Sequence, residues 1–488
     1  MFMEMAVRHT RFYPPRPGSI SVSEPQERPV LPDATLADQD VAPSSAQGQA
    51  ALSSRPNIVV AGGGAAGLEL VTQLGNRLGR RGRANIILVE GARAHLWKPL
   101  LHEVAAGSLD PEAYEVNYLA QAHWHGFRYR LGDMIGLDRS AKIVRLAASH
   151  DDEGREITPA RSIGYDILVI AIGSVTNDFG TPGVAEYGMP LETPAQAARF
   201  NRRLVNACYT AQTQTGPIRP GQLHVAIIGA GATGTELAAE LHRSLREVIG
   251  YGLDRIHPDK DTRVVLIEAA DRVLPALPER ISKATLRLLD RMGVEVHTAA
   301  RVKEVTRDGV RLADDSFIPA ELVVWAAGVK APDVLRDIDG LETNRINQLV
   351  VDLTLQTTRD PNIFAIGDCA ACPQPGEQGT VPPRAQAAHQ EASHMVGQIE
   401  RRLRDEPLLP FTYRDFGSLI SLGGQSTVGN LMGFLLGSGV FIEGLFARFV
   451  YDSLRLMHER ALNGTVNAVI GMLSRTLSRQ TGPAVKLH

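Results

Sequence analysis

The sequence predicts an α/β protein in which one nucleotide-binding unit occurs twice. The first copy has a short apolar run at residues 57–61, a G-x-G-x-x-G turn, an amphipathic stretch and a second apolar run at 85–89. The second copy repeats this order between residues 223 and 267. Short β-branched runs are typical of buried parallel strands, and apolar residues at helical spacing indicate a helix between them. The repeated strand, turn, helix and strand therefore predict two Rossmann-like domains.

The first glycine turn has the residues that a dinucleotide requires. Gly62 permits the tight turn, Gly64 lets the backbone approach a pyrophosphate, and Gly67 lets the helix pack closely on the strand. Ala65 opens the helix, whose free N–H groups attract phosphate. Glu90 ends the next strand, where a carboxylate accepts hydrogen bonds from the adenosine ribose.

The second turn repeats the spacing with Gly229, Gly231 and Gly234, and Glu268 ends its second strand. A carboxylate at that position repels a 2′-phosphate, so we expect a preference for NADH over NADPH, although Arg272 lies close enough to weaken it. Two dinucleotides in one chain suggest a donor and an acceptor. The natural pair is a nicotinamide cofactor and a flavin.

Later strands return to each nucleotide site and end in small residues. One closes on Gly173, a second on Gly328, and a third on Gly367 followed by Asp368. In flavoproteins with two nucleotides, an acid after such a strand binds the ribityl oxygens of the flavin. We favour that role for Asp368 over an acidic turn residue, because the strand and glycine context matches.

Four side chains have both a structural and a functional interpretation. Lys98 is either an ordinary surface lysine or a cation beside the flavin, and Glu236 either complements its helix dipole or contacts the nicotinamide. Gln386 and Gln390, which follow Ala385, are four residues apart and so share one helix face. They are either ordinary surface glutamines or donors to a quinone carbonyl.

The composition argues against several classes of protein. A chain of 488 residues suits two or three domains, and its net charge of -3 argues against a nucleic-acid partner. Its three cysteines (Cys208, Cys369 and Cys372) form no disulfide framework, which favours a reducing cytoplasm. The C-x-x-C spacing at Cys369 is more often incidental than a redox or metal motif, so we expect no metal site.

The two ends differ from the middle of the chain. Residues 1–54 are rich in proline and polar residues, which predicts disorder, and they have no secretory signal. The tail combines large apolar helix faces with basic residues, and no apolar run is long enough to span a bilayer. Such helices either lie in a membrane interface, dimerise or pack on the core.

These motifs together resemble one family. The segments HLWKPLLHEVAAGSLD, GAGATGTELAAEL, VVWAAGVKAP, AIGDCA and VPPRAQAAHQ are similar to those of bacterial type II NADH dehydrogenases. The C-terminal segments IEGLFARFVYDSL and KLH resemble the proteobacterial branch of that family. The similarity covers about residues 57–488, and the N-terminal extension is a departure from it.

The resemblance implies two domains in a glutathione-reductase-like arrangement with a membrane-attached tail. The expected FAD domain comprises residues 55–185 and 345–405, the NADH domain 186–344, and the attachment region 406–488. It implies non-covalent FAD, hydride transfer from NADH, and two-electron reduction of a membrane quinone without proton pumping. It further implies a homodimer attached peripherally to the cytoplasmic face of the inner membrane through C-terminal amphipathic helices.

The resemblance also implies roles for the undecided residues. Glu236 falls on the T-G-x-E position beside the nicotinamide, and Gln386 and Gln390 fall on the A-Q-x-x-x-Q motif on the quinone side. Two alternatives remain: a soluble flavin-dependent NADH reductase of a ferredoxin-like protein, and a non-catalytic nucleotide sensor. The quinone-side motif argues against both.

Overall fold

The computed structural model describes residues 55–376, 379–422, 426–431, 440–443, 455–466, 468–472, 474 and 485. The expected disordered segment, residues 1–54, lies outside the described residues, as does most of the tail around residues 444–454 and 475–484. Within the described residues, no helix is both long enough and apolar enough to cross a membrane.

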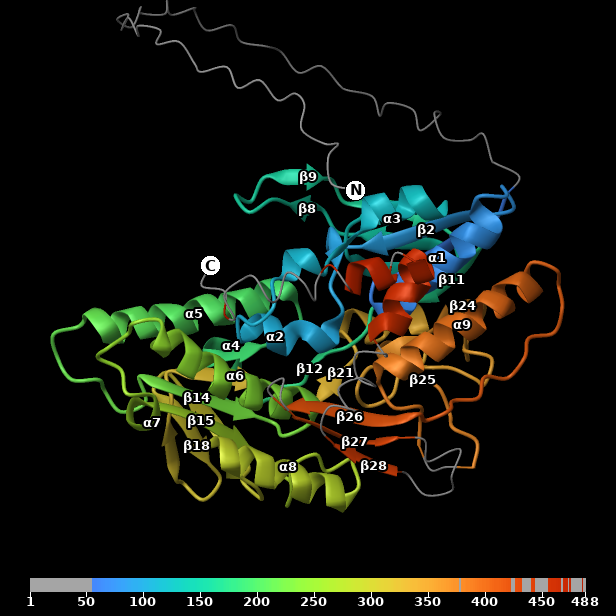
Figure 1. The fold of residues 1–488 in the computed structure, drawn as a ribbon. Coiled ribbons are helices and arrows are strands. Elements are labelled where there is room, and N and C mark those ends of the chain that lie inside the picture. Colours follow the sequence, from blue (N-terminus) through green and yellow to red (C-terminus); the bar gives the residue numbers. More distant parts are fainter. Residues whose placement is uncertain are drawn as a thin grey trace, which may run out of the picture. The chain divides into compact units, whose positions relative to one another are not determined.

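A six-stranded sheet forms one half of the architecture (Figure 1). Its order is β23 (Gln356–Thr357), β24 (Asp360–Ala365), β11 (Ile167–Ile170), β1 (Asn57–Ala61), β2 (Asn85–Glu90) and β5 (Arg128–Leu131). All pairs are parallel except β23 with β24. β1 lies between β11 and β2, and its apolar residues are fully buried, as a strand covered on both faces requires.

A five-stranded parallel sheet forms the other half. Its order is β13 (Gly188–Pro190), β20 (Leu322–Trp325), β14 (Leu223–Ile228), β15 (Thr262–Ile267) and β16 (Glu295–His297). The central three strands, β20, β14 and β15, repeat the β11, β1 and β2 arrangement of the first sheet. The predicted α/β fold with two Rossmann-like units is therefore confirmed.

Helices cover these sheets. α1 (Ala65–Leu74) follows β1 and packs against α9 (Ala385–Arg402), and α6 (Ala232–Gly250) follows β14 and packs on β15. α2 (Leu101–Ala105) contacts both α5 (Pro194–Thr213) and α6, and thereby joins the segment after β2 to the second unit. α8 (Glu279–Met292) packs near β16.

Smaller antiparallel sheets flank the two units. One contains β6 (Met134–Asp138), β7 (Ile143–Leu146) and β10 (Arg161–Gly164), and another contains β17 (Val302–Thr306), β18 (Gly309–Leu312) and β19 (Phe317–Pro319). β12 (Val175–Thr176) pairs with β21 (Val329–Lys330) where the chain passes between the units. A further three-stranded sheet follows α9 in the sequence and contains β26 (Gly417–Leu422), β27 (Ser426–Leu431) and β28 (Val440–Glu443). Its strand β26 contacts α6.

Candidate functional site

The two glycine turns have nearly the same backbone geometry. Gly62 and Gly229 have φ of +105° and +103°, which favours glycine. A Cβ on Gly67 would lie 1.9 Å from the Gly62 carbonyl oxygen, and one on Gly234 would lie 1.9 Å from that of Gly229. Each helix therefore starts against its strand at a distance that only glycine allows.

The middle glycine of each turn borders open space. A Cβ built on Gly64 or on Gly231 would meet no atom within 4 Å. These glycines are the N-caps of α1 and α6, and neither helix has a side-chain cap. Free N–H groups beside open space suit a pyrophosphate, so both turns fit a dinucleotide.

The acid after each turn is fixed in the same way. Glu90 accepts hydrogen bonds from the N–H of Gly63 at 2.6 Å and of Ala92 at 2.9 Å. Glu268 accepts from the N–H of Ala230 at 2.7 Å and of Ala270 at 2.9 Å. Each carboxylate is held at its glycine turn and retains lone pairs that a ribose hydroxyl could use.

A tyrosine that the sequence did not single out supports the first turn. The Tyr118 hydroxyl donates to the Gly63 carbonyl oxygen at 2.7 Å and is buried. Burial and the nearby Glu90 carboxylate raise the pKa of Tyr118, so the hydroxyl stays a donor. Only its nearness in space reveals this role, because 55 residues separate the two partners.

Several expected flavin-side residues meet through one serine. The Ser174 hydroxyl donates to Asp368 at 2.7 Å, and the Lys98 ammonium donates to the Ser174 carbonyl oxygen at 2.9 Å. Gly173 precedes Ser174, and a Cβ on Gly173 would meet no atom within 4 Å. Lys98 is exposed, and its ammonium group lies at this cluster.

The acid Glu391 on α9 completes the cluster, and the sequence analysis did not consider it. Its carboxylate accepts a hydrogen bond from the Gly367 N–H at 2.5 Å, and its side chain is buried. Burial raises the pKa of Glu391 to about 8, although the Gly367 bond opposes this shift, and the Asp368 charge adds to it. A neutral acid therefore lies behind Asp368 at neutral pH.

Gly367 and Gly328 occupy places where space is tighter. A Cβ on Gly367 would lie 3.6 Å from the Ala66 methyl group and 3.9 Å from that of Ala388, so this glycine lies where α1 and α9 approach. Gly328 has φ of +69°, and a Cβ there would lie 2.4 Å from the Phe179 ring.

Glu236 lies in the interior between several elements. Its carboxylate is 3.6 Å from His102 Nδ1 on α2 and accepts the Ser421 N–H of β26 at 3.0 Å. Burial raises the pKa of Glu236, although His102 and the Ser421 bond act in the opposite direction. The sequence singled out Glu236, but its contacts with His102 and Ser421 could not be found because these residues belong to distant segments.

Gln386 and Gln390 are on one face of α9, as their spacing predicts, but their amides are engaged. Gln390 bonds to the backbone of Arg414, and Gln386 bonds to the backbone of Phe416 and Gly417. Ala385 is the first residue of that helix. The structure therefore gives these glutamines protein partners at the positions where a quinone contact was expected.

The cysteines are buried free thiols. Burial raises the pKa of Cys369 and Cys372 to about 12 and that of Cys208 to about 11. Such thiols are protonated at neutral pH and unreactive. In the described part of the chain, no group of three His, Cys, Asp or Glu side chains could hold a metal.

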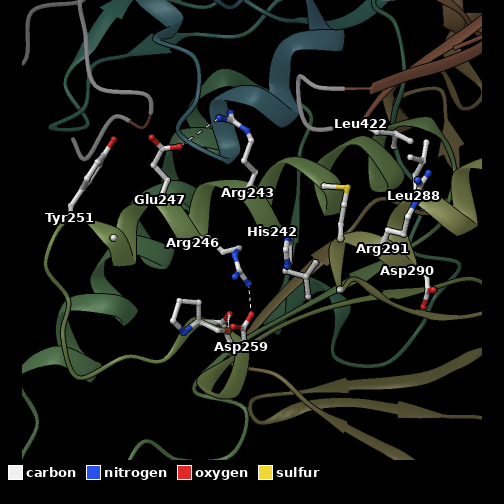
Figure 2. Close-up of a pocket in the computed structure, with 16 residues that line it drawn as sticks. His242, Arg243, Arg246, Glu247, Tyr251, Asp259, Leu288, Asp290, Arg291 and Leu422 are labelled. Atoms are coloured by element: carbon white, nitrogen blue, oxygen red, sulfur yellow. Dashed lines mark hydrogen bonds and ion pairs between the residues drawn. The ribbon is translucent and has the colours of Figure 1, made fainter. Parts of the chain in front are cut away.

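A hollow of about 1270 Å³ lies beside α6 (Figure 2), and no residue of either glycine turn lines it. Four of its charged lining residues are paired: Arg246 bonds to Asp259, and Arg243 lies 3.8 Å from Glu247. Neutralised ion pairs offer little to a charged ligand, so we assign this hollow no role in the chemistry.

Comparisons with known proteins agree with this geometry. The family described as pyridine nucleotide-disulphide oxidoreductase matches residues 56–392. The chain is 42% identical over 444 residues to a type II NADH:quinone oxidoreductase of Haemophilus influenzae, covering 88% of this chain and 100% of that protein.

Solved structures share the fold at low identity. A structure of NDH2 from Plasmodium falciparum in complex with NADH has a TM-score of 0.72 and 16% identity, covering 89% of this chain and 100% of that one. A ferredoxin reductase from Rhodopseudomonas palustris has a TM-score of 0.60 and 23% identity, covering 77% of this chain and 82% of that one.

Proposed function

The chain belongs to the pyridine nucleotide-disulphide oxidoreductase family and, within it, to the type II NADH:quinone oxidoreductases, and from this we propose which residues serve each substrate. The protein is a FAD-dependent NADH:quinone oxidoreductase. One observation supports this function above the others: the same glycine turn, with the same carboxylate bonds, occurs twice in one chain. A redox protein with two dinucleotide sites in one polypeptide needs a hydride donor and a cofactor that accepts the hydride.

We assign the first turn to FAD and the second to NADH. The FAD residues are those of the first turn and of the cluster around Ser174: Gly62, Gly64, Ala65, Gly67, Glu90, Gly173, Gly367 and Asp368. The NADH residues are Gly229, Gly231, Gly234 and Glu268. We propose Ala385, Gln386 and Gly328 as further cofactor neighbours. The six-stranded and five-stranded sheets support the proposed division into an FAD domain (55–185, 345–405), an NADH domain (186–344) and a C-terminal region (406–488).

The chain's own groups position the reactants. When bound, FAD supplies the redox chemistry by taking a hydride from NADH and giving two electrons to the quinone. Lys98 brings a positive charge next to Ser174 and Asp368, where it would stabilise negative charge. Glu236, buried beside His102, offers a carboxyl group to the nicotinamide side.

The function is tested by following NADH oxidation by FAD-loaded, detergent-purified protein, with and without a short-chain quinone. We expect rapid turnover only when quinone is present. Flavin reduction without quinone turnover would instead favour a protein acceptor, and no flavin reduction would favour the sensor.

Glu268→Gln should narrow the preference for NADH over NADPH, by roughly tenfold in the ratio of kcat/KM. A neutral amide no longer repels a 2′-phosphate, and it cannot accept both the Ala230 and the Ala270 N–H as the carboxylate does. Steady-state kinetics with both cofactors measure the ratio. The matched control is Glu90→Gln, which alters the equivalent acid at the first turn and should leave the ratio unchanged. An unchanged ratio in Glu268→Gln would contradict the assignment.

We propose that the C-terminal helical residues attach the protein to the membrane surface. Residues 455–466 are helical and are tied to the first unit, because His458 Nε2 lies 3.1 Å from His95 Nε2 and Gln121 donates to the Leu462 carbonyl oxygen at 2.9 Å. Burial lowers the pKa of His95 to about 4 and of His458 to about 3, so the pair is neutral at neutral pH. One imidazole can then donate to the other.

Four apolar side chains of this C-terminal region are open to solvent. Val466 is 72% exposed and Ile470 59%, and Met457 and Val469 are also exposed. Exposed apolar residues on a helix are typical of an interfacial membrane contact. We propose the cytoplasmic face of the inner membrane as the location, because NADH is supplied there. We also propose a homodimer, which the family resemblance implies and which light scattering tests.

Val466→Asp combined with Ile470→Asp should release most of the protein from membranes. Each added charge opposes insertion of the exposed apolar residues into the membrane interface, whereas the contacts of the buried His458 and Leu462 stay intact. Sedimentation with vesicles and soluble NADH oxidation with a short-chain quinone measure attachment and integrity. Arg460→Asp, on an exposed residue of the same C-terminal region, controls for added charge alone. Undiminished sedimentation of the folded double variant would overturn the assignment.

A further inference from the structure

Helix α9 carries a row of polar side chains that bind one extended segment by its backbone. Its members are spaced four residues apart and therefore share a face: Gln386, Gln390, His394 and Gln398. Their partners are backbone groups between residues 409 and 417. We call this row the α9 ladder. It ties the chain to α9 just before β26 begins.

Gln386 and Gln390 make the hydrogen bonds of the α9 ladder that lie closest to β26. The Gln390 amide donates to the Arg414 carbonyl oxygen at 2.8 Å and accepts the Arg414 N–H at 3.0 Å. The Gln386 amide accepts the Phe416 N–H at 3.1 Å and donates to the Gly417 carbonyl oxygen at 3.0 Å. Each glutamine thus holds the segment by both a donor and an acceptor, which fixes its register.

Asp415 accepts the remaining N–H of the Gln386 amide. Its carboxylate accepts a second bond from the Gln386 amide at 3.1 Å and pairs with Arg384 at 3.0 Å. A glutamine amide has two N–H donors and one oxygen, and all three now have a protein partner. A quinone carbonyl could bind Gln386 only by displacing one of these bonds.

The segment held by the ladder continues directly to Glu236. β26 begins at Gly417, and Ser421 within it donates its N–H to Glu236 at 3.0 Å. On either side of Ser421, Ile420 and Leu422 are buried with the apolar core of the second unit. A shift of β26 by one residue would invert its faces and remove the N–H from Glu236.

We propose that Gln386 and Gln390 are positioning residues, which fix the register of residues 414–421 and thereby hold the Ser421 N–H on Glu236. The α9 ladder thus connects the flavin-side helix to the acid on the nicotinamide side. The inference rests on the proposed function only in the role that Glu236 has toward NADH. The ladder itself is independent of that role.

Amide hydrogen exchange of the FAD-loaded, detergent-purified enzyme tests the ladder without measuring activity. Gln390→Ala and Gln386→Ala should each speed exchange in peptides covering residues 414–422 by roughly tenfold, because two hydrogen bonds to that backbone are lost. Gln356→Ala is the matched control: its amide donates to the Pro361 carbonyl oxygen at 2.8 Å, in the hairpin of β23 and β24. The control should leave residues 414–422 unchanged.

Anaerobic reduction by NADH tests the connection to Glu236. Gln390→Ala should slow flavin reduction by roughly fivefold without quinone present. In a Glu236→Gln background the same change should have no further effect, because the two residues act through one contact. A glutamine that contacted quinone would instead change only the KM for quinone and leave the NADH step intact.

Three results would overturn the proposal. Unchanged exchange at residues 414–422 would show that the ladder does not hold the segment. Faster exchange with an unchanged NADH step, or an additive effect in the Glu236→Gln background, would show that the ladder does not act through Glu236. If the unsubstituted enzyme were not reduced by NADH, the proposed function would fail, while the exchange result would still decide the ladder.

Discussion

Gly67→Ala should yield a protein that no longer retains FAD, whereas Gly234→Ala should retain FAD and lose NADH binding. In each case the added Cβ would lie 1.9 Å from a backbone carbonyl oxygen, closer than any real contact, so the helix must move away from its strand. The pyrophosphate depends on that helix N-terminus, and a misplacement of about 1 Å costs on the order of 100-fold. Flavin absorbance of the purified protein and the Kd for NADH measure the two losses.

Gly64→Ala and Gly231→Ala are the controls that separate packing from ligand contact. Their added Cβ atoms would meet no protein atom within 4 Å, so the variants should fold with a thermal midpoint close to that of the unsubstituted protein. They should nevertheless weaken FAD and NADH binding respectively, because the Cβ occupies the space left for the pyrophosphate. Full retention of FAD by both Gly64→Ala and Gly67→Ala would show that the first turn does not bind it.

The nucleotide turns could be predicted because their requirements are local. The backbone at Gly62 and the close packing at Gly67 exclude other residues, so the spacing together with the strand before it and the helix after it identifies the turn. The acid at the end of the next strand is also set by topology, since adjacent parallel strands end at the same edge. Glu90 and Glu268 are consequently found at equivalent positions with equivalent bonds.

The supporting side chains could not be predicted because they come from distant segments. Tyr118 bonds across 55 residues, and Ser174 bonds to Asp368 across 194. The spacing of Gln386 and Gln390 predicted a common face but not what that face meets. Their partners are backbone groups, which have no sequence signature. The sequence therefore could not reveal that these glutamines contact the segment around Arg414.

Glu391→Gln should stabilise the enzyme at pH 8 while leaving it nearly unchanged at pH 4.5. The folded-state pKa of Glu391, about 8, lies above the ordinary 4.5, so between these values the folded state holds a proton that the unfolded chain has released. The stability from this group is complete below pH 4.5 and is lost as the pH rises through about 8. Glutamine has no proton to lose, and its amide oxygen can still accept the Gly367 N–H.

The size of the stabilisation expected for Glu391→Gln follows from the pKa shift of Glu391. One pKa unit corresponds to about 1.4 kcal/mol, so the difference at pH 8 between Glu391→Gln and the unsubstituted enzyme should reach roughly 3–5 kcal/mol. Denaturant unfolding of the FAD-loaded enzyme from pH 5 to pH 8.5 measures it. Glu400→Gln on the same helix, where the acid is only partly buried and lies 3.8 Å from Arg77, is the control for removing a carboxylate from α9. A constant offset for Glu391→Gln across this range would mean that the buried carboxyl group is ionised throughout and that Asp368 has a charged neighbour.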